Sequence, residues 1–300
     1  GLADAHVHFD FTGGADESEA GEGASQFVRE PDGVLCRLFV AHGVTFVRSM
    51  WGTPEVVALR DTIDAGEVVG PAIVPTGPLL SEGGPAPVAP LQTAEDVERI
   101  FAEHAANGYD AMKLHSSPGL AATRLLLERA RREGVPVWGP APFSFALEDT
   151  IALEGRSTVE HLDTFVGAAV AEGSESLGRR WPAMMAIYNE QDPEKHASWA
   201  ARAKRSGKWF CPTLMTSRSA ALRPAEFDAL LTSYADEPVT AGTVAYWDRS
   251  VGQEKRIYEA SGLDFTGFRE APRAILRAFI AEGVPIIAGT DTPARPGVAG

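Results

Sequence analysis

The sequence lacks several features that mark particular classes of protein. It has only two cysteines, Cys36 and Cys211, in no CxxC pattern, so no disulfide framework is expected. No apolar run reaches the roughly 18 residues that a membrane-spanning helix needs. Basic residues are few, because 27 Lys and Arg stand against 41 Asp and Glu and give a net charge of −14. This charge argues against general binding to nucleic acids or to anionic membranes.

The start of the chain also lacks familiar signals. It begins Gly1-Leu2 without a methionine, and no signal peptide is visible. We therefore expect a processed start or part of a longer chain, and the sequence assigns no compartment.

Short β-rich runs alternate with amphipathic helical patterns along the chain. We predict eight strands, at 3–9, 45–49, 72–76, 111–115, 136–139, 158–161, 209–214 and 285–290. Eight strands with intervening helices indicate an α/β fold of the (β/α)₈ TIM-barrel type rather than an open doubly wound sheet. An open sheet would need a phosphate-binding glycine motif after its first strand. The glycine-rich stretch at 12–23 is acidic and long, so we interpret it as a mobile loop over a site.

Two of the intervening helices have clear end signals. The pattern at 93–108 begins with Thr93 as N-cap and ends at Gly108. The pattern at 120–134 ends in basic residues and Gly134, which suits a helix C-terminus.

The last third of the predicted barrel is irregular. The connection between 214 and 285 is far longer than one helix needs, and helical patterns at 223–237 and 243–260 predict a lid or a subunit contact. The chain ends 10 residues after the last predicted strand, which leaves no room for an eighth helix. We therefore expect one barrel domain over 1–300 that is a partial chain.

Ligand-type side chains lie on or after several predicted strands. The first strand has His6 and His8 on one face in DAHVHF, and two imidazoles at this spacing can bind one zinc ion. Lys113 lies on the fourth strand, His161 on the sixth, and Asp291 follows the eighth. Because the C-terminal ends of barrel strands converge, these side chains predict a metal centre. Two unrelated histidines remain the alternative for His6 and His8.

The stretch DAMKLHSS raises a separate question. Alternate strand residues share a face, so Met112 and Leu114 would point one way, and Lys113 and His115 the other. A lysine that points into a buried interior is costly unless something neutralises or uses it.

Six stretches together resemble the amidohydrolase superfamily of metal-dependent hydrolases. They are GLADAHVHF, AHGVTFVRSMWG, DAMKLH, VPVWGPAP, TVEHLD and AGTDTP, and they follow the family order over nearly the whole chain. The sequence looks most like the imidazolonepropionase- and prolidase-related bacterial branch. The resemblance implies a distorted barrel with its metal site in the C-terminal mouth, and a small flanking β-sandwich that this chain lacks.

The resemblance also implies roles for the candidate ligands. His6, His8 and Asp291 would bind the more buried of two divalent metals, most simply zinc, and His161 the more exposed one. Lys113 would be carboxylated by CO₂ to a carbamate that bridges both, which turns a costly buried cation into an anion. Asp291 would take a proton from a metal-activated water and deliver it to the leaving amine, with His161 beside the reacting centre. An unmodified Lys113 that pairs with Asp291 is the alternative.

One position departs from the family pattern. Relatives commonly have a metal-binding histidine on the fifth strand, where this chain has Pro140, which offers no ligand atom. Three outcomes follow: a mononuclear site, a replacement ligand or an inactive site. His115 is the candidate replacement, and contact with substrate or solvent is its alternative role.

Four further residues are candidates for substrate binding. Arg48, Trp51 and Trp138 follow or lie on predicted strands, and Arg218 could hold a substrate carboxylate. For each of them, packing or a surface salt bridge is the alternative.

The predicted function is hydrolysis of a C–N bond other than an ordinary peptide bond. A cyclic amide, an N-acyl amino acid or a dipeptide-like molecule would be the small-molecule substrate, with no nucleic-acid or membrane partner; a homo-oligomer is left open. Two alternatives stand beside this: a lactone, ester or phosphotriester hydrolase with the same site, and a catalytically impaired ligand-binding barrel because of Pro140.

Overall fold

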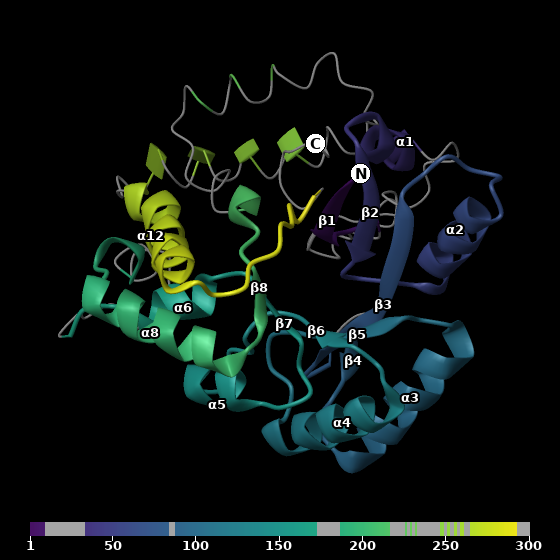
Figure 1. Ribbon diagram of the computed structural model, residues 1–300, viewed down its shortest axis with the longest axis horizontal. Coiled ribbons are helices and arrows are strands. Elements are labelled where there is room, and N and C mark those ends of the chain that lie inside the picture. Colours follow the sequence, from purple (N-terminus) through teal and green to yellow (C-terminus); the bar gives the residue numbers. More distant parts are fainter. Residues whose placement is uncertain are drawn as a thin grey trace.

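Parallel strands form a ring in the computed structural model of the chain (Figure 1). The structure describes residues 1–9, 34–83, 88–172, 187–216 and 265–292, with scattered helical residues between 226 and 260. One sheet has the order β1 (Leu2–Val7), β2 (Val44–Ser49), β3 (Ala72–Ser81), β5 (Ala111–Leu114) and β6 (Val137–Trp138), with β4 (Val88–Pro90) beside β3. A second sheet pairs β7 (Thr158–Glu160) with β8 (Trp209–Cys211).

Isolated contacts connect the two sheets into a closed ring. Three parallel bridges do so, namely Pro140–Glu160, Phe210–Ile286 and Val7–Thr292. Residues 285–292 thereby take the eighth position between β8 and β1, where the N–H of Ala5 donates to the carbonyl of Ala288 at 2.8 Å. The predicted α/β barrel architecture is confirmed.

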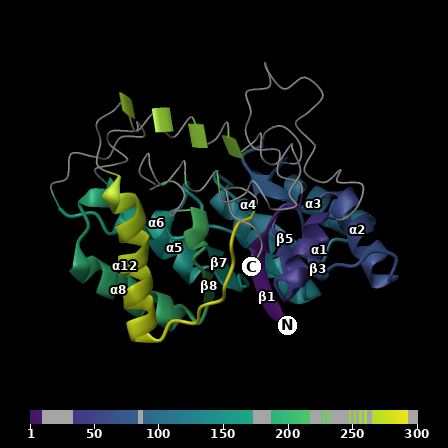
Figure 2. The ribbon, with the colours of Figure 1, turned by 90° about the horizontal axis from the view of Figure 1, so that it is seen from above.

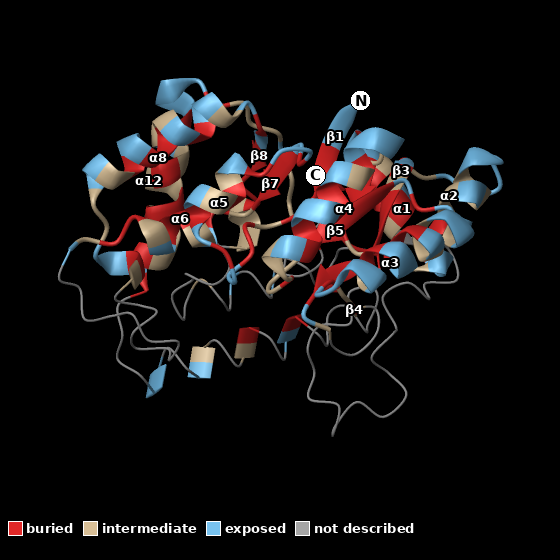
Figure 3. Ribbon diagram, turned by 90° about the horizontal axis from the view of Figure 1, so that it is seen from below, coloured by how far each residue is buried: buried red, intermediate tan, exposed pale blue. Residues whose placement is uncertain are grey.

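Helices cover the outside of this ring (Figure 2). They are α1 (Val34–Ala41), α2 (Pro54–Asp64), α3 (Ala94–Asn107), α4 (Leu120–Glu133), α5 (Leu147–Ala152), α6 (Asp163–Ala168), α8 (Pro193–Ser206) and α12 (Thr266–Glu282). Buried residues follow the strands and the helix faces turned toward them (Figure 3). Phe165 of α6, for example, packs edge-on against Phe210 of β8 and Phe279 of α12, with ring centroids 5.7 and 5.2 Å away. None of the helices in the described ranges is long and apolar enough to cross a membrane.

The predicted helix ends are confirmed where the sequence carried cap signals. Thr93 accepts a hydrogen bond from the N–H of Asp96, whose carboxylate accepts from the N–H of Thr93, as a capping box requires. Gly108 and Gly134 end α3 and α4 in the left-handed conformation, at φ 67° and 72°. Helix α12 was not predicted, because it carries Pro272 in its interior and its N-cap residue Phe265 provides no side-chain cap.

Several strand bounds differ from the prediction for local reasons. β3 continues to Ser81 because a register shift between Thr76 and Leu79 carries it past Gly77-Pro78. β6 is only two residues long, since Gly139 has φ 130° and Pro140 has no N–H to donate. The eighth position is held by bridges rather than by a regular strand, and β4 was not predicted.

Some predictions fall outside the described part of the chain. The loop at 12–23 and residues 293–300 lie there, as do most residues of the helical patterns at 223–237 and 243–260. Within the described ranges every strand belongs to the ring or, as β4, to its edge, so no β-sandwich occurs among them.

Candidate metal centre in the barrel mouth

Strand alternation sends charged side chains into the ring. On β5, Met112 and Leu114 join the apolar cluster beneath α3 and α4, whereas Lys113 points into the barrel and is 2% exposed. The interior also holds His6 from β1 and Glu160 from β7, both buried. Barrel interiors of this type are usually filled by apolar layers, so buried charges here need partners.

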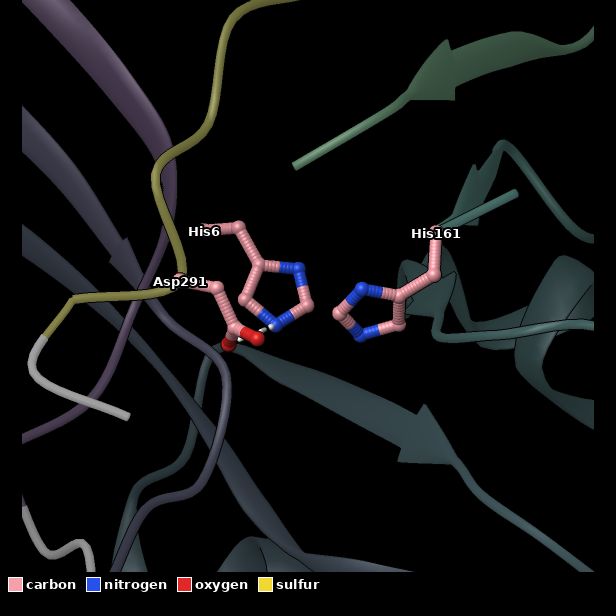
Figure 4. A group of neighbouring side chains, drawn as sticks. All are labelled: His6, His161 and Asp291. Atoms are coloured by element: carbon pink, nitrogen blue, oxygen red, sulfur yellow. Dashed lines mark ion pairs between the residues drawn. The ribbon is translucent and has the colours of Figure 1, made fainter. Parts of the chain in front are cut away.

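Three ligand-type side chains meet at the C-terminal mouth of the barrel. Ligand atoms of His6, His161 and Asp291 all lie within 4.8 Å of one another (Figure 4). Oδ1 of Asp291 lies 3.2 Å from Nε2 of His6 and 2.7 Å from Nε2 of His8. The three chain segments that carry these residues, β1, the end of β7 and 285–292, therefore contribute to one centre.

Lys113 lies beside the same centre. Its Nζ atom is 3.4 Å from Nε2 of His6. Burial lowers the pKa of Lys113 to about 8, although the charges of Asp291 and Glu160 act against this shift. A fraction of its amine is therefore neutral at neutral pH, and the neutral amine is the form that can react with CO₂.

Burial also sets the charge of the other groups. It lowers the pKa of His8 to about 4 against the contact with Asp291, and it lowers the pKa of His161. Burial alone would raise the pKa of Asp291, but His6 and His8 hold it well below its usual range. Neutral imidazoles and an anionic carboxylate are the forms that bind a metal ion.

Backbone strain is concentrated at this centre. The non-glycine residues with positive φ in the described ranges are His161 (61°), Thr213 (44°) and Asp291 (63°). Nδ1 of His161 also lies 2.6 Å from Oγ1 of Thr213. Such conformations cost roughly 1–3 kcal/mol each and cluster at functional sites, so the strain supports a functional role for this mouth.

Glu160 is a member of the centre that the sequence analysis missed. It lies inside the barrel, 3.0 Å from Nδ1 of His6. Alternation from His161 would place Glu160 on the outer face, but the positive φ of His161 breaks that alternation. Its position in TVEHLD, directly before a predicted ligand, was the available signal.

The residues predicted to bind substrate have varied surroundings. Arg48 is buried, donates to the carbonyl of Ala5 at 2.6 Å, and stacks its guanidinium 4.4 Å from the ring centroid of Trp138. Trp51 lies edge-on to His8 with ring centroids 6.2 Å apart. Arg218 lies outside the described residues.

The fifth ring position supplies no ligand atom near Lys113. Pro140 bridges to β7, and Trp138 is the register partner of Lys113. His115 is half-buried at the mouth with Nδ1 2.8 Å from Oγ of Ser116, and burial followed by the charge of Lys113 lowers its pKa to about 3.

The fold is similar to the folds of several solved structures. The chain is similar to a bottromycin amidohydrolase (TM-score 0.67, 22% identity, 100% of this chain and 60% of that chain). It is also similar to a prolidase complexed with N-methylphosphonate-L-proline (0.55, 18%, 97% and 65%) and to ochratoxinase of A. niger (0.55, 17%, 99% and 63%). No family model and no curated protein matches the chain.

These similarities show a shared barrel fold. The chain spans between 60% and 65% of the length of these three proteins.

Proposed function

We propose that the chain is a member of the amidohydrolase superfamily and a metal-dependent hydrolase of a C–N bond other than an ordinary peptide bond. The observation that carries this proposal is the convergence of His6, His161 and Asp291 within 4.8 Å at the barrel mouth. Lys113 lies beside His6, and His8 lies beside Asp291.

The donor set fits a divalent metal ion. Two imidazoles and a carboxylate are ligands that zinc accepts, and here His6 and Asp291 are buried and His161 is partly buried. His6, His8, His161 and Asp291 would hold the ion, and Lys113, as a carbamate, would add anionic oxygens. A bound divalent ion would supply a water with a pKa lowered to about 7.

Side chains around the proposed metal ion would transfer the proton and hold the ligands in place. Asp291 is anionic and reaches the centre of the mouth, so it is placed to accept a proton and return it to a leaving amine. Thr213 holds the ring of His161, which limits its rotation. Trp51, which follows β2, lies edge-on to His8 and so packs beside one of the proposed ligands.

The proposed substrate class is based on the names of the structurally similar proteins. An amidohydrolase, a prolidase and ochratoxinase are the similar proteins described above. We therefore propose a small-molecule amide substrate: a cyclic amide, an N-acyl amino acid or a dipeptide-like molecule. Arg48 is occupied inside the barrel by Ala5 and Glu160, which leaves residues at the rim to bind a substrate carboxylate.

The number of metal ions depends on the fifth ring position. Without a ligand from Pro140 or Trp138, a second ion would keep only His161 and the Lys113 carbamate, unless His115 joins them. A mononuclear centre and a centre completed by His115 are both compatible with this donor set.

Metal analysis and a substrate panel test the proposal. We expect purified protein to contain zinc or a similar ion, and to hydrolyse amides in a panel that also holds lactones and phosphotriesters. Asp291→Asn should lower kcat by about 10²–10⁴-fold, because it removes the proton acceptor. Hydrolysis of only lactones or phosphotriesters would replace the amide assignment. Protein that binds no metal and cleaves nothing with added Zn²⁺ or Mn²⁺ would overturn it.

A further inference from the structure

We infer that Glu160 is a positioning residue, which fixes the ring of His6 so that Nε2 faces the proposed metal ion. The inference rests on the proposed function, because it concerns how one of the proposed ligands is oriented. Glu160 itself would not touch the ion or the substrate.

The two nitrogens of His6 have different surroundings. Nδ1 lies 3.0 Å from Oε2 of Glu160, deep in the barrel, where both side chains are fully shielded from solvent. Nε2 lies 3.2 Å from Oδ1 of Asp291 and 3.4 Å from Nζ of Lys113, at the mouth. With Nδ1–H donating to Glu160, Nε2 has its lone pair available toward His161 and Asp291. Metal-binding histidines commonly use a carboxylate in this way.

The carboxylate of Glu160 is itself held in place. Its Oε1 atom accepts hydrogen bonds from Nη2 of Arg48 at 3.1 Å and from Oγ1 of Thr158 at 2.6 Å. Burial opposes ionisation of Glu160, but the bond to His6 and the charge of Arg48 hold its pKa at about 2. Both oxygens are therefore engaged, and rotation of the carboxylate would break a buried charged hydrogen bond.

Arg48 connects this arrangement to the backbone of β1. Its Nε atom donates to the carbonyl of Ala5, the residue before His6, at 2.6 Å. The guanidinium also lies over the ring of Trp138 on β6. Contacts with β1, β2 and β6 thus fix the position of the Glu160 carboxylate beside His6, and this gives the imidazole a defined orientation.

A rival interpretation uses the same residues differently. Ligand atoms of His6, Glu160 and Cys211 also lie within 4.8 Å of one another, which is close enough for a deeper metal site. A divalent cation there would face the guanidinium of Arg48, which already pairs with Glu160 at 3.1 Å. Like charges repel strongly in a shielded interior, so the structure favours the ion on the Nε2 side.

Zinc affinity, measured by competition with a chromophoric chelator, tests the role of Glu160. We expect Glu160→Gln to bind zinc about 10–100-fold more weakly than the wild type. Thr123→Val is the control, because Thr123 is a fully buried threonine on α4, outside the ring; its affinity should stay within about threefold. The double variant Arg48→Met/Glu160→Gln removes the unpaired buried cation, and it should remain as weak as Glu160→Gln.

Spectroscopy of the wild type tests the orientation without any variant. In zinc-loaded protein with ¹⁵N-labelled histidine, His6 should carry its proton on Nδ1 and zinc on Nε2. Cobalt-loaded protein should show no thiolate-to-cobalt absorption, since Cys211 is not a ligand. Zinc on Nδ1, a thiolate band, or Glu160→Gln with wild-type affinity would each overturn the role of Glu160. Wild-type protein that binds neither zinc nor cobalt would instead overturn the proposed function.

Discussion

The Nζ atom of Lys113 lies 3.4 Å from Nε2 of His6, the nitrogen that faces the proposed metal ion. An ammonium group and a divalent cation cannot share this place, because both are positive and both are shielded from solvent. Binding of a metal therefore requires that Lys113 lose its charge, either as a neutral amine or as a carbamate.

Replacement of Lys113 should show whether this residue acts as a neutral amine or as a carbamate. We expect Lys113→Ala to lower kcat/KM by about 100-fold or more and to weaken zinc binding, and acetate should restore part of both by substituting for the carbamate oxygens. Lys208→Ala is a matched control, since Lys208 is also buried but precedes β8 at the opposite end of the barrel. Loss of activity with no rescue by acetate would show that Lys113 acts as an amine.

The number of metal ions in the proposed centre should depend on His115. If its imidazole replaces the ligand missing at Pro140, His115→Ala should halve the metal bound per chain, as measured by elemental analysis. Ser116→Ala is the control, because it removes only the hydroxyl 2.8 Å from Nδ1 of His115. Unchanged stoichiometry in His115→Ala would assign the imidazole to substrate or solvent.

The buried histidines predict a loss of stability in mild acid. Burial lowers the pKa of His8 to about 4 and of His115 to about 3, from 6.5 in the unfolded chain. Because the folded-state pKa values are depressed, this stability is fully present above the unfolded pKa of 6.5 and is lost as pH falls toward the folded values. Each histidine should remove up to about 1.4 kcal/mol of unfolding free energy per pH unit.

Urea titrations of metal-free protein at pH 7 and pH 5 measure this loss. The carboxylates with lowered pKa values, Asp291 and Glu160, stay ionised over this window and contribute little to the slope. His115→Asn should show a shallower fall in unfolding free energy than the wild type. Equal slopes would mean that His115 is protonated in the folded state at pH 5.

Gly139 is expected to be essential for the end of β6. Its φ of 130° is accessible to glycine alone in practice, and an added Cβ would overlap the carbonyl of Leu114 on β5. Gly139→Ala should therefore lower the unfolding free energy by at least about 2 kcal/mol more than Gly134→Ala. Gly134 has φ 72° but nothing within 4 Å of an added Cβ. The Gly134→Ala variant therefore measures only the free-energy cost of a positive φ in alanine, without a steric overlap. Equal stability of the two variants would contradict the prediction.

Hydrophobic periodicity and helix-cap residues were sufficient to predict much of the fold from the sequence. Thr93, Gly108 and Gly134 marked helix ends because capping depends on a few neighbouring residues. The alternation of Met112, Lys113 and Leu114 placed the lysine correctly, because β5 is regular there.

Irregular backbone limited the prediction elsewhere. The positive φ of His161 turns the His161 side chain to the inner face that Thr158 and Glu160 share by regular alternation, and no side-chain pattern predicts such a conformation. The two-residue length of β6 follows from the φ of Gly139, a position where an added Cβ would overlap the carbonyl of Leu114 on another strand, and a local reading of VPVWGPAP could not reveal this close approach. The partners of Arg48 depend on pairing between residues 112 positions apart.

The segment 285–292 also determines when the centre can come into existence. Asp4 of β1 accepts hydrogen bonds from the N–H and the hydroxyl of Thr290, the residue before Asp291, at 3.0 and 2.6 Å. These bonds join residues 286 positions apart, so they form only when the first strand and the 285–292 segment have come together. Until these bonds form, Asp291 is not held beside His6. The proposed centre is therefore assembled only when the ring closes.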